Sequence, residues 1–303
     1  MLFASIDIGS NAARLLLANV FDSAHEPCAA SHVTFVRVPL RLGEDVFRDG
    51  MISEQKIANL IKTLRAYKLL IDVYMPADFD ICATAAMREA ANREEIIQRV
   101  KKETGLTIRV IDGQEEAAII RESNELFLKY GDKTLMYVDV GGGSTEISIL
   151  HDNNFVASRS FDVGTLRMLQ KKIKEEHCNE MLRWVKEWTA PFDNILCVGS
   201  GGNINKLVKL YGDKMTSCVT LKELNDGCQK LKKLSVAERM EKLKLRPDRA
   251  DVIVPAAKIF SFVMSAANIN TVLAPKLGLV DGLISELAQK HRNSPLAAAA
   301  QKS

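Results

Sequence analysis

The stretch DVGGGSTE combines residue types that could hold a phosphate group and a divalent cation side by side. Asp139 ends an apolar run, three glycines occupy 141–143, and Ser144, Thr145 and Glu146 follow. Glycines let backbone N–H groups approach a ligand closely and adopt positive φ, and the two hydroxyls add donors. Carboxylates beside a phosphate repel it unless a cation lies between, so Asp139 and Glu146 are expected to hold Mg²⁺. The alternative is a tight hairpin in which the glycines serve only the turn.

Two further turns repeat this chemistry. The stretch SIDIGSN, with its aspartate at Asp7, has the same form as YVDVGGGS: an apolar run, Asp, an apolar residue, Gly and a small polar turn. This echo predicts a duplicated hairpin at the start of two similar domains, with a cleft between them. A third glycine loop, GSGG, follows another apolar run at Val198. Phosphate contacts are therefore expected from Ser10, Asn11, Gly141, Gly142, Gly143, Ser144, Thr145, Gly199, Gly201 and Gly202.

Arg88 is a further candidate for phosphate binding. It follows an expected strand at 79–83, and an arginine can grip phosphate with two parallel hydrogen bonds. The alternative is a solvated charge that pairs with Glu89 or Glu95.

Glu116 is the candidate general base. Asp112 is expected to be the N-cap of a helix that begins at Gly113, and Glu115 is placed to complete a capping box with it. Glu116 is then left without a structural task, in the first helical turn just past a strand, where sites form in α/β folds. The alternative is an acid at a helix start, favoured there by the helix dipole.

The elements that position these residues alternate between strands and helices. Strands are expected at 3–7, 13–21, 79–83, 107–111, 134–139, 146–150 and 195–198. Helices are expected from 53, at 93–104, at 113–130 and from 203, and the remainder is expected to be mostly helical, with a last helix at 284–296.

Composition excludes several classes of protein. The 303 residues are 47% hydrophobic and 26% charged, with a net charge of +3, which gives no reason to expect a nucleic-acid polymer or an anionic membrane as partner. No secretory signal, membrane span, CxxC pair, GxSxG or GxxxxGK[ST] motif occurs, and the five histidines lie outside the motifs above. The six cysteines are expected to be reduced and the protein cytoplasmic.

Together these motifs resemble the exopolyphosphatase and guanosine pentaphosphate phosphohydrolase family of the actin-like ATPase superfold. The resemblance covers nearly the whole chain and rests on DIGSN, ATAAMREAAN, GQEEA, DVGGGSTE, GSGG and RADVIVP, in that order. Two segments depart from the family pattern: GLVDG at 278–282 stands where the family usually has GLREG, and an alanine follows Pro255 where a glycine is frequent. These departures bear on substrate preference more than on the chemistry.

The resemblance implies an α/β fold with two actin-like (ribonuclease H-like) domains, 1–120 and 121–303, an interdomain cleft, and a last helix packed back on the first domain. It implies a hydrolase that releases terminal phosphate from inorganic polyphosphate, with Glu116 as the base and Mg²⁺ at Asp139, Glu146 and Asp7. A guanosine pentaphosphate 5′-phosphohydrolase, with a link to the stringent response, needs the same chemistry. A non-catalytic sensor of polyphosphate or guanosine tetraphosphate, or a kinase or ATPase of the superfold, are further alternatives. A homodimer is an expectation at the family level only.

Overall fold

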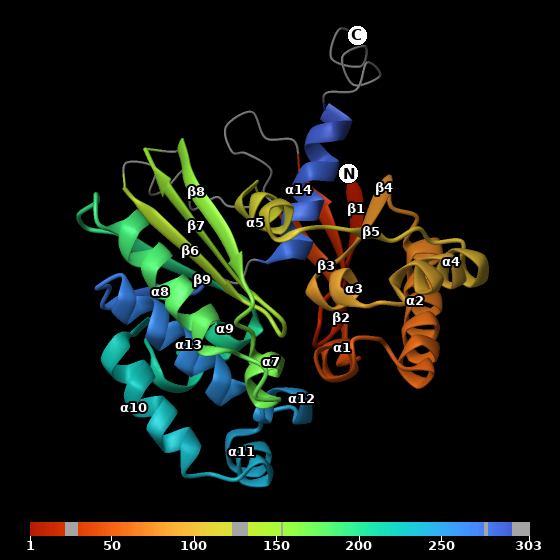
Figure 1. Cartoon of the computed structure of the whole chain (residues 1–303). Coiled ribbons are helices and arrows are strands. Elements are labelled where there is room, and N and C mark those ends of the chain that lie inside the picture. Colours follow the sequence, from red (N-terminus) through yellow and green to blue (C-terminus); the bar gives the residue numbers. More distant parts are fainter. Residues whose placement is uncertain (22–29, 123–132, 153, 276–277, 293–303) are drawn as a thin grey trace, which may run out of the picture. The chain divides into compact units, whose positions relative to one another are not determined.

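The computed structural model describes residues 1–21, 30–122, 133–152, 154–275 and 278–292, and it contains two α/β units (Figure 1). The first unit takes in residues 1–42, 51–125 and 277–303, and the second takes in residues 43–50 and 126–276. Each unit is built on one mixed sheet. The α/β class expected from the sequence is confirmed.

The sheet of the first unit has the strand order β3-β2-β1-β4-β5. Strands β1, β2 and β3 are antiparallel neighbours, whereas β1, β4 and β5 run parallel. The middle strand β1 is buried along nearly its whole length, which explains its apolar sequence. The strands are β1 (Leu2–Ile8), β2 (Ala13–Val20), β3 (Ala30–Val38), β4 (Asp78–Ala83) and β5 (Arg109–Val110).

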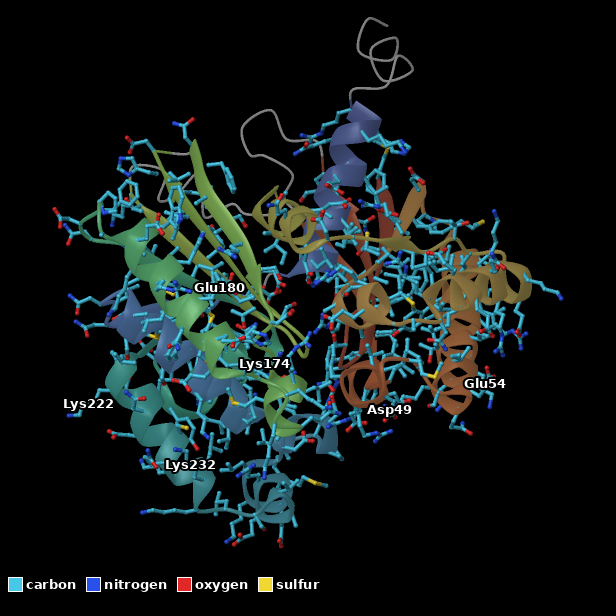
Figure 2. The ribbon with its side chains drawn as sticks, viewed as in Figure 1. Asp49, Glu54, Lys174, Glu180, Lys222 and Lys232 are labelled. Atoms are coloured by element: carbon cyan, nitrogen blue, oxygen red, sulfur yellow. The ribbon has the colours of Figure 1, made fainter. Side chains whose placement is uncertain are left out.

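Helices of the first unit follow the apolar periodicity of their sequences. The stripe expected in α2 is buried, while Glu54 at its start points outward (Figure 2). Helix α4 ends where the sequence predicts, at Gly105, which has a φ of +72°. The helices are α2 (Glu54–Tyr74), α3 (Ala85–Glu89), α4 (Arg93–Thr104), α5 (Gly113–Glu122) and α14 (Leu279–Arg292).

Helix α14 begins at Leu279, five residues before the expected start at 284. Its apolar residues Val280, Ile284 and Leu287 pack with Phe3 of β1 and Leu16 of β2. The early start follows from this packing, since Val280 already belongs to the buried face.

The sheet of the second unit has the order β10-β11-β9-β6-β7-β8. Strands β6, β9 and β11 run parallel, and β6, β7 and β8 form an antiparallel meander. One large apolar cluster fills this unit between its sheet and its helices. The strands are β6 (Leu135–Val140), β7 (Thr145–His151), β8 (Asn154–Phe161), β9 (Leu196–Ser200), β10 (Cys218–Thr220) and β11 (Thr271–Leu273).

The helices of the second unit are amphipathic. Helix α10 buries Leu224 and Leu231, while Lys222 and Lys232 extend into solvent (Figure 2). The helices are α1 (Leu42–Asp49), α7 (Thr165–Leu169), α8 (Glu175–Thr189), α9 (Gly202–Tyr211), α10 (Leu221–Lys232), α11 (Val236–Leu243), α12 (Pro247–Ala250) and α13 (Ile253–Ala266).

Several strands are missing from the sequence-based prediction. Strands β3 and β8 are edge strands whose residues are largely exposed or half-buried, so they lack a long apolar run. Strands β10 and β11 have three residues each, too few for a periodic pattern. The expected helix at 113–130 is seen to residue 122, and its remainder lies outside the described residues, as does the end of the last helix beyond 292.

Within the described part of the chain, no helix is long and apolar enough to span a bilayer. The five cysteines described there form no disulfide.

Candidate active site

The hairpin of the second unit brings its two carboxylates face to face. Asp139 on β6 is the direct partner of Glu146 on the antiparallel strand β7. Side chains of directly paired residues lie on the same face of a sheet, and here a carboxylate oxygen of Asp139 lies within 4.8 Å of one of Glu146. Ser160 Oγ of β8 donates to Glu146 at 2.8 Å, which fixes that side chain. The structure therefore pairs the two acids as the sequence led us to expect.

The glycine turn between these strands is held through its carbonyl groups. The carbonyl of Gly141 accepts from Thr165 N at 3.0 Å, and that of Gly142 accepts from Leu166 N at 2.9 Å. The carbonyl of Gly143 accepts from Arg167 Nε at 2.8 Å. Because the C=O and N–H groups of a trans peptide point in opposite directions, these bonds direct the amide N–H groups of Gly142, Gly143 and Ser144 away from residues 165–167. Such a row of N–H groups is suited to an anion.

The 141–143 turn is formed without positive φ, and Gly164 packs closely against it. Among the described glycines, positive φ occurs at Gly50, Gly105 and Gly201, so the positive φ expected in the 141–143 turn is wrong. Instead, the backbone of Gly164 presses against the turn. A Cβ on Gly164 would lie 2.3 Å from the carbonyl carbon of Gly143 and 2.4 Å from the oxygen of Gly142.

Residues 164–167 are a support for the turn that the sequence analysis missed. Arg167 is buried, and its guanidinium lies 4.3 Å from the ring centroid of Phe47 in α1. The sequence does contain a pattern that could have indicated this role: Gly164 follows a strand and directly precedes a helix that carries a basic residue.

The third glycine loop joins β9 to α9 beside Asp139. Gly201 has a φ of +97°, and a Cβ there would lie 3.1 Å from Asp139 Oδ1. A Cβ on Gly202, the first residue of α9, would lie 2.5 Å from an Arg249 guanidinium nitrogen. The start of α9 and Arg249 therefore both contribute positive potential near this loop. Gly199 differs, because its neighbours are the side chains of core residues; a phosphate contact there stays a prediction.

The hairpin of the first unit repeats the geometry with a different partner for its aspartate. Gly9 N donates to Ala12 O at 3.1 Å, just as Gly141 N donates to Ser144 O at 2.9 Å. Asp7, however, is paired across the strands with Arg14, and the two side chains form an ion pair. Burial raises the pKa of the Asp7 carboxyl above its ordinary value, although Arg14 lowers it in part.

Ser10 and Asn11 lie in the same turn. Ser10 is buried, and the Asn11 carbonyl accepts from Arg41 N at 2.9 Å. Their expected contact with phosphate stays a prediction.

Arg88 supports the backbone that leads into α5. It lies on the short helix α3 after β4, and its Nη1 donates to the Ile111 carbonyl at 3.0 Å. One donor of the five on the guanidinium is used in this bond. The sequence left open a surface pairing of Arg88 with Glu89 or Glu95, but the contact seen for this side chain is with Ile111. Phosphate binding by its other donors stays a prediction.

Glu116 lies in the first turn of α5 and is 8% exposed. The expected N-cap is present, because Asp112 Oδ1 accepts from Gln114 N at 2.9 Å and from Glu115 N at 2.8 Å. The Glu115 carboxylate forms an ion pair with Arg109. Glu115 therefore has a structural role as expected, but among the described contacts it acts through Arg109 and not through the expected capping box with Asp112.

Of the expected site residues, the first unit holds Asp7, Ser10, Asn11, Arg88 and Glu116. Strands β1, β4 and β5 are parallel, so the loops that follow them lie at one edge of the sheet, where ligands bind in open α/β folds. The second unit holds the glycine turn, Asp139, Glu146 and the β9–α9 loop.

Asp139 and Glu146, two residues suited to a metal ion, lie together in the second unit. Two facing carboxylates repel each other unless a cation is shared between them, and oxygen donors are the ligands that Mg²⁺ prefers. The donor set of Asp139 and Glu146 therefore fits a hard divalent cation. Asp7 fits less well, because its partner Arg14 already supplies the positive charge.

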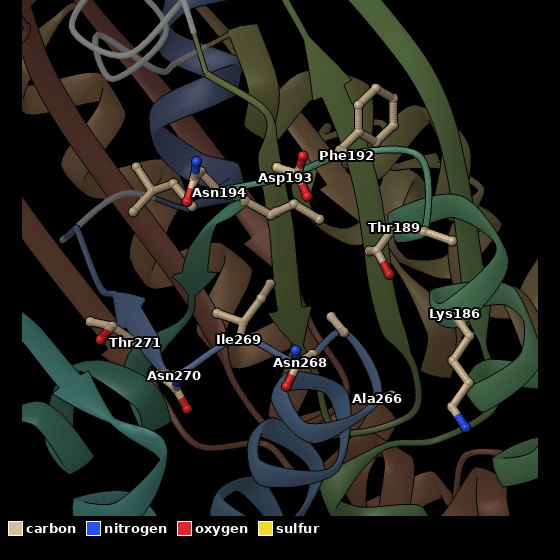
Figure 3. Close-up of a pocket in the computed structure, with 14 residues that line it drawn as sticks. Lys186, Thr189, Phe192, Asp193, Asn194, Ala266, Asn268, Ile269, Asn270 and Thr271 are labelled. Carbon is tan, nitrogen blue, oxygen red and sulfur yellow. The ribbon is translucent and has the colours of Figure 1, made fainter.

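A separate pocket of about 690 Å³ opens on the second unit (Figure 3). It lies at the amino-terminal ends of β9 and β11, where α8 and α13 end. Helix carboxyl ends and the Asp193 side chain make this region unfavourable for phosphate. The pocket is therefore not assigned to the candidate site.

Comparison with known proteins gives a consistent result. A model of the Ppx/GppA phosphatase family matches residues 23–291. The chain is 28% identical over 286 residues to the bifunctional 3-dehydroquinate synthase/phosphatase of Fusobacterium nucleatum, covering 86% of this chain and 43% of that protein. It is 25% identical over 299 residues to exopolyphosphatase 1 of Mycobacterium tuberculosis, covering 92% and 86%. It is 24% identical over 321 residues to guanosine-5′-triphosphate,3′-diphosphate pyrophosphatase of Vibrio atlanticus, covering 100% and 62%.

The chain thus spans less than half of the first relative and less than two thirds of the third. Among solved structures, an Aquifex aeolicus member of the Ppx/GppA family has a TM-score of 0.76 and 26% identity, covering 97% of this chain and 99% of that one. An exopolyphosphatase from Cytophaga hutchinsonii has a TM-score of 0.82 at 20% identity, covering 96% and 98%, and shows the shared fold alone. Because the family model matches most of its length, the chain belongs to the Ppx/GppA phosphatase family.

Proposed function

We propose that the protein hydrolyses the terminal phosphoanhydride bond of inorganic polyphosphate. The observation that carries this proposal is the second-unit hairpin. Its turn offers a row of amide N–H groups for a phosphoryl group, and Asp139 and Glu146 face each other beside it. Family membership and the exopolyphosphatase among the relatives support the same reaction.

In this proposal the N–H groups of Gly142, Gly143 and Ser144 hold the oxygens of the terminal phosphoryl group. The positive end of α9 at Gly202 and the free donors of Arg88 add to the binding of the anion. Fixed donors of this kind stabilise the charge that spreads over the equatorial oxygens in the transition state.

Asp139 and Glu146 would hold Mg²⁺, which would offset the charge of the phosphates. Glu116 is proposed as the general base in the same reaction, accepting a proton from the attacking water. The neighbouring acids have structural roles instead: Asp112 caps the helix and Glu115 forms an ion pair with Arg109.

A second candidate is hydrolysis of the 5′-terminal phosphate of guanosine pentaphosphate, favoured by the relative from Vibrio atlanticus. Both reactions use the same phosphoanhydride chemistry and differ in what holds the rest of the substrate. A non-catalytic sensor would have no use for a base, and Glu116 is present.

Phosphate release from long-chain polyphosphate, guanosine pentaphosphate and ATP, measured in parallel, tests the proposal. We expect the highest kcat/KM with polyphosphate, and Glu116→Gln is expected to slow release from each active substrate by about 10² to 10⁴. Faster release from guanosine pentaphosphate would select the second candidate. Binding of polyphosphate without release by the wild-type protein would indicate a sensor.

A further inference from the structure

Helix α14 lies against the backbone of α5 at Gly282. A Cβ built on Gly282 would lie 2.1 Å from the carbonyl oxygen of Ile119 and 2.6 Å from its carbonyl carbon. Both atoms are backbone, so no side-chain rotation could relieve the contact. The absence of a side chain at Gly282 therefore sets the distance between these two helices.

Backbone conformation does not require this glycine. Gly282 lies inside α14 and is not among the described glycines with positive φ. Glycine in a helix interior is less favourable than alanine, because it loses more conformational freedom on folding. The close approach to Ile119 is the feature that an alanine would remove.

An ionic cluster and an apolar cluster hold α5 in the same place. Arg109 forms ion pairs with Glu115 of α5, with Asp80 of β4 at 2.7 Å, and with Glu286 of α14 at 3.6 Å. Ile119 and Ile120 of α5 pack with Leu279 and Leu283 of α14. Glu115 and Ile119 are four residues apart and so lie on the same face of α5, and both sets of contacts hold that face of the helix in place.

Helix α14 is in turn fixed to the sheet of the first unit. Ser5 Oγ of β1 donates to the Val280 carbonyl at 2.8 Å. His32 Nε2 of β3 lies 2.8 Å from Asp281 Oδ1. These contacts are made by the two residues directly before Gly282, so they hold this part of α14 against the sheet.

We infer that Gly282 is a positioning residue for Glu116. Ile119 lies three residues after Glu116 on the same short helix, so a displacement of the Ile119 backbone displaces Glu116 with it. This inference rests on the proposed function, in which Glu116 is the base. The phosphate-binding groups of the second unit are not part of this contact.

Gly282→Ala is the direct test. Carbon–oxygen contacts of this kind are normally about 3.3 Å, so the added methyl requires a shift of about 1 Å between the helices. A misplacement of that size can lower the rate about 10²-fold. We expect Gly282→Ala to lower kcat by about that factor, with KM for polyphosphate changed much less. Hydrogen exchange of the α5 amides should become faster in the same variant.

Leu287→Ala is the matched control, because Leu287 packs on the sheet side of α14 and is not among the residues clustered with α5. It should lower the melting temperature but leave kcat and α5 exchange close to wild type. Adding Ile119→Ala to Gly282→Ala should not restore kcat, because it removes only the Ile119 Cγ2 contact at 2.7 Å and leaves the carbonyl.

Three outcomes would overturn the inference while the proposed function stands. The first is a wild-type kcat in Gly282→Ala, the second is a loss of kcat in Leu287→Ala equal to that in Gly282→Ala, and the third is a return of kcat to the wild-type value when Ile119→Ala is added. In each case Glu116→Gln is still inactive. A wild-type protein that releases no phosphate, or an active Glu116→Gln, would instead reject the proposed function, and the positioning role with it.

Discussion

At the residue scale, equivalent positions in the two hairpins carry side chains of opposite charge. Asp7 faces Arg14 across the first hairpin, whereas Asp139 faces Glu146 across the second. The first pair neutralises itself, and the second concentrates negative charge that an Mg²⁺ ion would balance. The residue opposite the aspartate, Arg14 in the first hairpin and Glu146 in the second, thus distinguishes a hairpin that balances its own charge from one whose carboxylates could share a metal ion.

Glu116 and Glu115 are neighbours with separate tasks, and their amide variants are expected to behave differently. Glu116→Gln should lower kcat by about 10² to 10⁴, because loss of a general base has that effect. Glu115→Gln should keep kcat and lower the free energy of unfolding by about 0–1 kcal/mol, since its pair with Arg109 is half-exposed. Steady-state phosphate release and thermal melts of both variants measure these effects. A dead Glu115→Gln beside an active Glu116→Gln would reverse the assignment.

At the element scale, the start of α7 forms the base of the glycine turn. The backbone N–H groups of residues 165–167 and the Arg167 side chain occupy the carbonyl groups of the turn. Because the C=O and N–H groups of a trans peptide point in opposite directions, the N–H groups of the turn are directed away from α7. The proposed anion site therefore depends on the close approach of two backbone segments, Gly164 and the turn at 142–143.

Gly164→Ala should therefore disturb phosphate binding from outside the turn. The new methyl would lie 2.3–2.6 Å from backbone atoms of Gly142 and Gly143. Overpacking of this kind costs typically about 1–3 kcal/mol, and we expect a lower melting temperature together with a raised KM for polyphosphate. Gly278→Ala is the control, because its Cβ would meet nothing closer than 4.0 Å. An unchanged KM in Gly164→Ala would show that α7 does not shape the turn.

The docking of α14 on β3 should depend on pH. The hydrogen bond from His32 to Asp281 holds the pKa of His32 above its ordinary value of 6.5, although burial lowers it in part. A raised histidine pKa contributes stability that is fully present below pH 6.5 and is lost as the pH rises through the folded-state value. His32→Gln should therefore flatten the fall in melting temperature between about pH 6 and pH 9. Melts across this range in wild type and variant test it, and parallel curves would contradict it.

At the scale of the whole chain, the sequence predicted the central strands and the turn between Asp139 and Glu146 better than the elements that support them. Strands with long apolar runs, such as β1 and β6, were predicted because burial on both faces leaves that pattern. Edge strands β3 and β8 leave a weaker pattern and were missed. The cross-strand pairing of Asp139 with Glu146 could be predicted, because a tight turn between β6 and β7 fixes the register of the two strands.

Tertiary contacts account for what the sequence could not predict. The ion pair of Glu115 with Arg109 and the approach of Gly282 to Ile119 join residues that local patterns do not relate. Gly164 shows the same limit: its role becomes visible only where its backbone meets the turn of another hairpin.

The central claim is that Asp139 and Glu146 hold the metal ion used in phosphoanhydride hydrolysis. Titration of Mg²⁺ against phosphate release from polyphosphate, in wild type, Asp139→Asn, Glu146→Gln and Asp7→Asn, tests it most directly. An amide oxygen is a weaker ligand for a hard cation than a carboxylate, so the Mg²⁺ midpoint should move to higher concentration in the first two variants. In Asp7→Asn it should stay at the wild-type value, because Asp7 is paired with Arg14. Midpoints equal to wild type in both Asp139→Asn and Glu146→Gln would contradict the claim.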